Sequence, residues 1–261
     1  AAIDAAALVY LACPPVPRRD LTLMAAAAGK AVFLEKPLGV DVAASEAMVA
    51  ALQHAGVPAA VNFTQAAGAA LADISQAAQT GDLGDIIGVD MVVTYGNWPR
   101  AWQQQADWLR FRAEGGMTRE VISHFLFFSE RILGPLSVSF AHPSYPEDSR
   151  LCETHLLARL VSATGQPVSI RASVGGAQPD RQEVTIKGSH ISRRVAEFSI
   201  DMESDGGPFT AIETPPDDPR AVALKAQLDQ LALCVAGKPH RLATLDEALR
   251  VQRLVEQMLT L

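Results

Sequence analysis

Residues 32–39, VFLEKPLG, end an apolar run with a glutamate, a lysine and a proline in succession. Charges at the end of a buried strand cost free energy unless they are paired, and a proline there removes a backbone donor and stops the strand ladder. Two interpretations fit equally well. One is a surface turn; the other is a site in which Glu35 accepts hydrogen bonds from ribose or sugar hydroxyls and Lys36 contacts a reacting oxygen.

Glu120 and His124 are a second pair of residues that could do chemistry. They stand four apart in GGMTREVISHFLFFSERILG (115–134), which has the pattern of an amphipathic helix, so they are expected to share one face. A carboxylate beside an imidazole can orient it, raise its pKa and help to move a proton. Gly115 and Gly116 would let the backbone approach a ligand closely. Taken alone, the pair fits an ion pair on a helix surface better.

The elements that carry the first motif alternate between strand and helix. Apolar strands are predicted at 7–13, 31–35 and 57–63, with helices at 18–28 and 41–54 between them. Continuous apolar strands separated by helices predict a parallel sheet covered on both faces. Because ligands bind beyond the carboxyl ends of such strands, the following residues are expected to line one crevice: Cys13, Pro14, Pro15, Glu35, Lys36, Pro37 and Asn62.

The pattern changes after residue 63. A helix is predicted at 68–79, a strand at 86–96 and a helix at 115–134, followed by strands near 136–142, 152–163, 167–175, 181–187 and 193–203 and by helices at 217–237 and 244–260. The predicted fold class is α/β, a partial Rossmann domain with a doubly wound parallel sheet plus an α+β domain with a large, mainly antiparallel open sheet. The predicted domains are 1–63, with 217–261 packing back on it, and 64–216.

Composition excludes several classes of function. The 261 residues carry a formal net charge of −7 without a basic stripe, which argues against nucleic acid as a partner. Three distant cysteines without C-x-x-C or Cys/His spacing predict no metal site and a reducing, cytoplasmic location. No apolar run reaches about 18 residues, so no membrane span or membrane partner is expected.

Four segments in order resemble the Gfo/Idh/MocA family, the glucose–fructose oxidoreductase and inositol dehydrogenase type of NAD(P)-dependent enzymes. They are GKAVFLEKPLGVDVAASEAMVAALQHAGV, GDLGDIIGVDM, GGMTREVISHFLFFSERILGP and LDQLALCVAGKPHRLATLDEALRVQRLVEQML, and together they cover nearly the whole chain. The resemblance implies a Rossmann domain for NAD or NADP and a second domain over the substrate. It implies hydride transfer between nicotinamide and a hydroxyl or carbonyl carbon of a sugar, polyol or related small molecule, in a homodimer or homotetramer.

The resemblance also implies roles for individual residues. Lys36 matches the catalytic lysine, His124 the histidine that exchanges the hydroxyl proton, and Glu120 a third catalytic position where many members have Asp. The implied cofactor contacts are Cys13, Pro14, Pro15, Arg18, Glu35, Pro37 and Asn62, with a cis bond expected before Pro37 and Arg18 standing where many members have His. Lys36, Trp98, Trp108 and His124 are predicted to contact substrate. The tryptophans, with Trp102, would form a sugar-stacking lid, although a loop or subunit contact fits them equally well.

Two departures keep other functions open. Ala66 stands where Arg is common, and no G-x-G-x-x-G turn precedes Leu8, so the sequence is expected to begin about halfway through its Rossmann domain. The alternatives are a non-catalytic ligand-binding or regulatory homologue and a redox-neutral NAD-dependent glycoside hydrolase or lyase.

Overall fold

The computed structural model describes residues 2–103, 105–214 and 216–261. The N-terminal part contains a parallel sheet of β1 (Leu8–Leu11), β2 (Ala31–Glu35) and β3 (Ala59–Asn62), in that order. Helices α1 (Ala2–Ala5), α2 (Pro15–Ala27) and α3 (Val42–Ala55) accompany it. The Asp41 side chain accepts from the N–H of Ala44 to begin α3, and Gly56 ends it in a left-handed conformation. The predicted parallel sheet is confirmed.

A second sheet of eight strands has the order β11-β10-β9-β8-β4-β7-β6-β5. Its neighbours pair antiparallel except β4 and β7, which are parallel, as expected for a mainly antiparallel sheet. The strands are β4 (Ile86–Tyr95), β5 (Leu136–Ser144), β6 (His155–Ser162), β7 (Pro167–Val174), β8 (Arg181–Gly188), β9 (Ser192–Ala196), β10 (Ile200–Ser204) and β11 (Thr210–Ala211).

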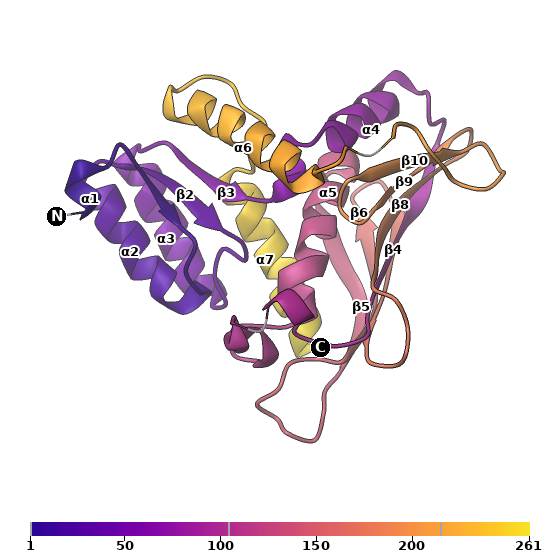
Figure 1. Ribbon diagram of the computed structural model, residues 1–261, viewed down its shortest axis with the longest axis horizontal. Helices are drawn as coiled ribbons and strands as arrows, with labels where there is room; N and C mark the ends of the chain where they lie inside the picture. Colours follow the sequence, from indigo (N-terminus) through magenta and orange to yellow (C-terminus); the bar gives the residue numbers. More distant parts are fainter. Residues whose placement is uncertain (1, 104, 215) are drawn as a thin grey trace.

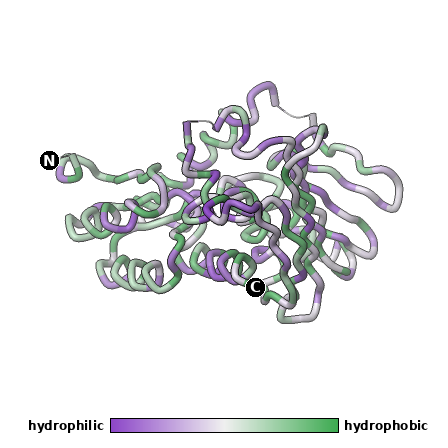
Figure 2. The backbone as a smooth tube through the Cα atoms, turned by 90° about the horizontal axis from the view of Figure 1, so that it is seen from below, coloured by the Kyte–Doolittle hydropathy of each residue, from purple (hydrophilic) through white to green (hydrophobic). Residues whose placement is uncertain are grey.

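One face of the large sheet is covered and the other is open. Residues along β6 and β7 alternate between buried and exposed, and hydrophobic and hydrophilic residues alternate along the strands in Figure 2. The covered face lies toward α5 (Ser123–Leu133), where Ser123 to Glu130 are all buried. Short 3₁₀ helices lie at Thr64–Ala67, Ala101–Gln103 and Asp107–Arg110, and α4 (Ala69–Thr80) packs against α5.

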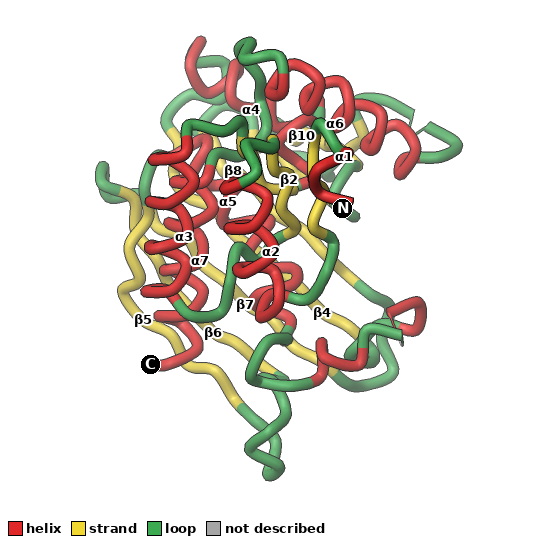
Figure 3. The backbone as a smooth tube through the Cα atoms, turned by 90° about the vertical axis from the view of Figure 1, so that its left-hand side faces the viewer, coloured by secondary structure: helices red, strands yellow, loops and turns green. Residues whose placement is uncertain are grey.

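The C-terminal helices connect the two sheets. Ala243, just before α7 (Leu245–Thr260), bridges Val61 of β3, and α6 (Pro219–Val235) packs against β3. Helix α7 lies beside α3 and also packs on β5 and α5 (Figure 3). The largest buried cluster therefore includes residues of both sheets, while the predicted division at residues 63 and 216 stays a prediction. No helix among the described residues combines the length and apolar character needed to cross a membrane.

Two predicted elements were wrong in detail. The strand expected at 193–203 is a hairpin of β9 and β10, turned by Glu197 (φ 49°) and Phe198 (φ 65°). No glycine signals this turn; instead the Phe198 ring stacks on Phe125, with centroids 5.3 Å apart, so a tertiary contact helps to hold the left-handed backbone. The helix expected at 115–134 begins as a π-helical turn (Thr118–Ile122) before α5.

Candidate active site

Glu35 and Asn62 meet at the carboxyl end of the small sheet. They are register partners on β2 and β3, and the Asn62 amide Nδ2 donates to Glu35 Oε1 at 2.7 Å. The Tyr10 hydroxyl donates to the same oxygen, and its burial together with the neighbouring carboxylate raises the pKa of Tyr10 to about 12. Asn62 Oδ1 is buried without a partner among the described residues. The carboxylate is thus held by neutral donors, and one amide acceptor is left for a ligand.

Arg18, on the first turn of α2, ties the neighbouring strand ends together. Its guanidinium donates to the backbone oxygens of Glu35 at 2.5 Å, of Cys13 at 2.6 Å and of Pro37. The side chain is 2% exposed, and burial lowers its pKa. We interpret Arg18 as a positioning residue for these loops; its predicted contact with a cofactor stays a prediction. The Lys36–Pro37 peptide bond is cis.

The predicted cofactor segment also includes Cys13, Pro14 and Pro15, which lie close to Arg18 in the chain. Cys13 is half-buried, Pro14 precedes the first residue of α2, and Pro15 is that residue. Ala66, at the position where the resemblance suggests an arginine, is buried in the 3₁₀ helix Thr64–Ala67. Arg18 therefore holds the backbone of Cys13 beside the end of β2, and the cofactor contacts of Cys13, Pro14 and Pro15 stay predictions.

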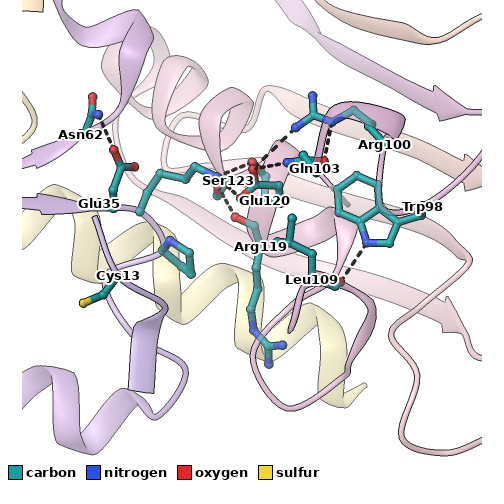
Figure 4. Close-up of polar contacts among 12 residues, drawn as sticks. Cys13, Glu35, Asn62, Trp98, Arg100, Gln103, Leu109, Arg119, Glu120 and Ser123 are labelled. Carbon is teal, nitrogen blue, oxygen red and sulfur yellow. Dashed lines mark hydrogen bonds and ion pairs between the residues drawn. The ribbon is translucent and has the colours of Figure 1, made fainter. Parts of the chain in front are cut away.

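Lys36 connects the end of β2 to the π-helical turn, because its partner is Glu120, 84 residues further along the chain. Figure 4 shows Glu120 between the strand ends and the loop that carries Arg100 and Gln103. The ammonium Nζ donates to the backbone oxygen of Glu120 at 2.8 Å and forms an ion pair with Glu120 Oε2. Both side chains are largely buried, with exposed fractions of 8% and 16%. The sequence predicted both residues for one site but not their direct contact.

The other oxygen of Glu120 faces the loop after β4. Gln103 Nε2 donates to Glu120 Oε1 at 3.0 Å, and an Arg100 guanidinium nitrogen lies 3.6 Å from that oxygen. Sequence reasoning missed Arg100 and Gln103. They belong to a loop without regular spacing, and the only signal was the density of tryptophans around them.

The prediction that Glu120 raises the pKa of His124 is wrong. The carboxylate is used by Lys36, and His124 Nδ1 has no hydrogen-bond partner among the described residues. Burial first, and then the charges of Lys36 and Arg100, hold the pKa of His124 well below 6.5 instead of raising it. The reason for the misplacement is the π-helical turn, whose wider winding breaks the i,i+4 alignment of an α-helix. His124 is therefore a neutral base between the edges of Phe63 and Phe198.

The π-helical turn is fastened from two sides. Arg119 forms two 2.7 Å contacts with the Glu256 carboxylate of α7 and donates to the backbone oxygens of Arg112 and Gly115. The buried Glu153 carboxylate accepts the Thr118 N–H at 2.7 Å. A Cβ on Gly116 (φ +109°) would lie 2.5 Å from Glu153 Oε2. These contacts fix the segment that carries Glu120 and His124.

Trp98 and Trp102 pack against Arg100 together with Tyr95, and the predicted sugar-stacking role of the tryptophans stays a prediction. The Arg100 guanidinium lies over the rings of Tyr95, Trp98 and Trp102 at 5.3, 5.8 and 4.7 Å. Trp98 Nε1 donates to the Leu109 backbone oxygen at 3.0 Å. Trp108 lies on the 3₁₀ helix Asp107–Arg110, and within the described residues its side chain makes no polar or ring contact with Lys36, Glu120 or His124.

Residues 2–63 match the family model described as an oxidoreductase family with an NAD-binding Rossmann fold, Gfo/Idh/MocA. Among solved structures, the chain is similar to an aldose–aldose oxidoreductase from Caulobacter crescentus complexed with glycerol, at 23% identity and a TM-score of 0.79, covering 98% of this chain and 77% of that one. It is also similar to an inositol dehydrogenase homologue from Azotobacter vinelandii complexed with NAD+, at 17% identity and a TM-score of 0.80, covering 99% and 78%. At these low identities, the structural similarity shows that the chain shares the fold of these proteins. No curated protein gives a match.

Proposed function

We propose that the chain is an NAD(P)-dependent dehydrogenase or reductase acting on a hydroxyl or carbonyl carbon of a sugar, polyol or related small molecule, because residues 2–63 match the Gfo/Idh/MocA family of oxidoreductases. One observation carries this proposal. Lys36, from the end of a parallel strand, and His124, on α5, are both buried, and the Lys36 charge lies close enough to help lower the pKa of His124. A buried ammonium beside a neutral imidazole is a suitable pair for proton transfer at a C–OH group.

The residues at the strand ends fit a nicotinamide cofactor. Asn62 is 9% exposed, and its Oδ1 is an acceptor without a partner in the described chain, as a ribose hydroxyl would require. Glu35 and Asn62 would hold that ribose, and the segment Cys13, Pro14 and Pro15 would line the nicotinamide. When bound, the nicotinamide supplies the acceptor or donor of the hydride.

The chain's own residues handle the oxygen and its proton. Lys36 Nζ has three N–H donors, two of which are directed to Glu120, so one is available to a substrate oxygen. Glu120 stabilises the ammonium in its buried position, and the ammonium in turn stabilises negative charge on that oxygen. His124 is neutral and can accept the hydroxyl proton on a ring nitrogen during oxidation, or return it during reduction. The rings of Phe63 and Phe198 pack against His124, which is 6% exposed.

The test is turnover of NAD+ and NADP+ with a panel of sugars, polyols and inositols. Lys36→Met and His124→Gln are each expected to lower kcat/KM by about 10²–10⁴-fold, with cofactor binding retained in a fluorescence titration. Lys225→Met, an exposed lysine on α6, is the matched control and should keep full activity. Turnover unchanged in both site variants would overturn the assignment. Cofactor binding without net turnover of any compound would instead favour a ligand-binding homologue or a redox-neutral enzyme.

Two further properties belong to the proposal. A homodimer or homotetramer would bury the open face of the large sheet, where Phe140 and Leu157 are 51% and 57% exposed; light scattering after gel filtration would measure the mass. A cytoplasmic location agrees with the free state of Cys13, Cys152 and Cys234, and cell fractionation would test it.

A further inference from the structure

Arg100 is a buried cation in the candidate site that the proton-transfer scheme above does not use. It follows β4, and its side chain is only 13% exposed. Its Nε donates to Gln103 Oε1 at 2.8 Å, and one terminal nitrogen faces Glu120 Oε1 at 3.6 Å, beyond hydrogen-bond distance. Figure 4 shows the other terminal nitrogen directed away from both partners.

The surroundings hold this guanidinium mainly through the rings that pack against it and through its Nε, and among the described residues the only polar contact of a terminal nitrogen is the 3.6 Å ion pair with Glu120. The rings of Tyr95, Trp98 and Trp102 pack against it, and Gln103 holds it from the Nε side. In the described chain, neither terminal nitrogen donates a hydrogen bond. A planar fork that is oriented in advance, with free donors, matches the geometry of a carboxylate.

The charges around Arg100 also favour an anion. Lys36 and Arg100 both face Glu120, which supplies one negative charge for two positive ones. His124 adds no charge at neutral pH, because its pKa is lowered well below 6.5. On the strand-end side, the charge of Glu35 lies beside the buried charge of Arg18. Among Lys36, Arg100, Glu120, Arg18 and Glu35, positive charges therefore exceed negative ones by one before a substrate binds.

We propose that Arg100 binds a carboxylate of the substrate, so that the substrate is a sugar acid or hydroxy acid and not a neutral sugar. This inference rests on the proposed function for the reaction but names a separate contact. Lys36 and Arg100 face the two oxygens of one carboxylate, Glu120, so a carboxylate on Arg100 and an oxygen on Lys36 can belong to one small molecule, a few bonds apart.

The test compares acids with neutral partners of the same carbon skeleton. Binding of D-glucuronate against D-glucose, and of D-gluconate against D-glucitol, is measured with NADH present by isothermal titration calorimetry, which needs no turnover. At least one acid is expected to bind about 10-fold or more tightly than its neutral partner, as a charge-assisted bidentate contact requires. Arg100→Gln should remove this preference while leaving the affinity for the neutral partner within about twofold.

Two further variants separate a direct contact from a general effect of charge. Arg110→Gln removes an exposed arginine of the same loop and should keep the preference. Gln103→Leu removes the acceptor that orients Arg100 and should reduce the preference only in part. Circular dichroism establishes that each variant is folded.

Three results would overturn the inference: equal affinity for acids and neutral partners, equal loss of both in Arg100→Gln, or no binding by either acid. Equal loss of both would mean that Arg100 only positions Glu120. If the protein binds acids selectively through Arg100 but turns over no compound, the inference about Arg100 is supported and the proposed reaction is contradicted.

Discussion

The two sides of the candidate site are each fastened by a buried arginine, and the two arginines are compensated in different ways. Arg18 holds the strand ends of the small sheet through three backbone carbonyls, and burial lowers its pKa. Arg119 holds the π-helical turn through two carbonyls and a bidentate ion pair with Glu256. Despite burial, that pair raises the pKa of Arg119.

The contrast indicates how each side would respond to change. Arg18 donates its hydrogen bonds in the described chain to neutral carbonyl oxygens, and the Glu35 charge acts on it without a hydrogen bond, so removing the guanidinium mainly leaves unsatisfied acceptors. Removing the Arg119 guanidinium leaves a carboxylate that is 15% exposed and has lost its counterion. The π-helical side therefore depends on one charge pair, whereas the strand-end side also has the regular hydrogen bonds of a parallel sheet.

The largest expected effect is that of Arg119→Met. It should lower the free energy of unfolding by about 3–5 kcal/mol, because it leaves Glu256 without its cation. Urea unfolding followed by circular dichroism measures it. Lys225→Met, which breaks an exposed pair with Asp229, is the control and should change stability by less than about 0.5 kcal/mol.

The double variant Arg119→Met/Glu256→Leu sharpens this prediction. Replacing both members of a buried ion pair by apolar residues is often nearly neutral, so most of the loss should be recovered. No recovery would mean that the carbonyls of Arg112 and Gly115 dominate, as at Arg18, and the contrast between the two arginines would be lost.

Arg18→Met should have the next largest effect, about 2–3 kcal/mol, because its hydrogen bonds to three carbonyls disappear. Adding Glu35→Gln should not restore stability, because the Glu35 carboxylate forms its hydrogen bonds with Tyr10 and Asn62 and not with Arg18. The neighbouring Arg19, whose side chain is 48% exposed, provides the control Arg19→Met, with little change expected. Recovery by Glu35→Gln would show that Arg18 is compensated by charge after all.

Gly116→Ala tests the backbone of the π-helical side. Its φ of +109° and the close Glu153 carboxylate should together cost roughly 2 kcal/mol of unfolding free energy. Gly134, at the other end of the same helical segment, has a φ of +76° but no atom within 4 Å of a built Cβ. Gly134→Ala should therefore cost less, about 1 kcal/mol. Equal losses in thermal unfolding would contradict a role for Glu153 in fixing this segment.

The smallest expected effect is the pH dependence of stability that His124 causes. Like Arg18, His124 forms no ion pair with a carboxylate in the described chain, but unlike Arg18 it can lose its proton near neutral pH. Its pKa is lowered by burial and then by Lys36 and Arg100. Below about pH 6.5 the unfolded chain binds a proton that the folded chain does not, so stability falls as pH falls. Relative to His124→Gln, wild type should lose roughly 1 kcal/mol between pH 6.5 and 5.5.

Urea unfolding at the two pH values measures this difference, and His54→Gln on the exposed end of α3 should keep the wild-type slope. A wild-type slope in His124→Gln as well would mean that His124 is protonated in the folded protein.

The strand-end side of the site was predictable because its order is local. Apolar runs, an N-cap at Asp41 and a stop at Gly56 define strands and helices within a few residues of one another. Parallel pairing then brings the ends of consecutive strands to one edge, which is why Glu35 and Asn62 could be expected to be neighbours. Strand pairing could not predict that Arg18 is buried, because its burial depends on contacts with the backbone of Cys13, Glu35 and Pro37.

The parallel sheet and most strand boundaries of the large sheet could be predicted from periodicity and turn chemistry, and the residues of the site from the family resemblance. Which charges meet depends on how distant segments pack together. The π-helical turn directs Glu120 to Lys36 and leaves His124 neutral, and the loop after β4 brings Arg100 and Gln103 to the same carboxylate. These contacts join residues far apart in the chain, and their energies depend on burial, which no local pattern records.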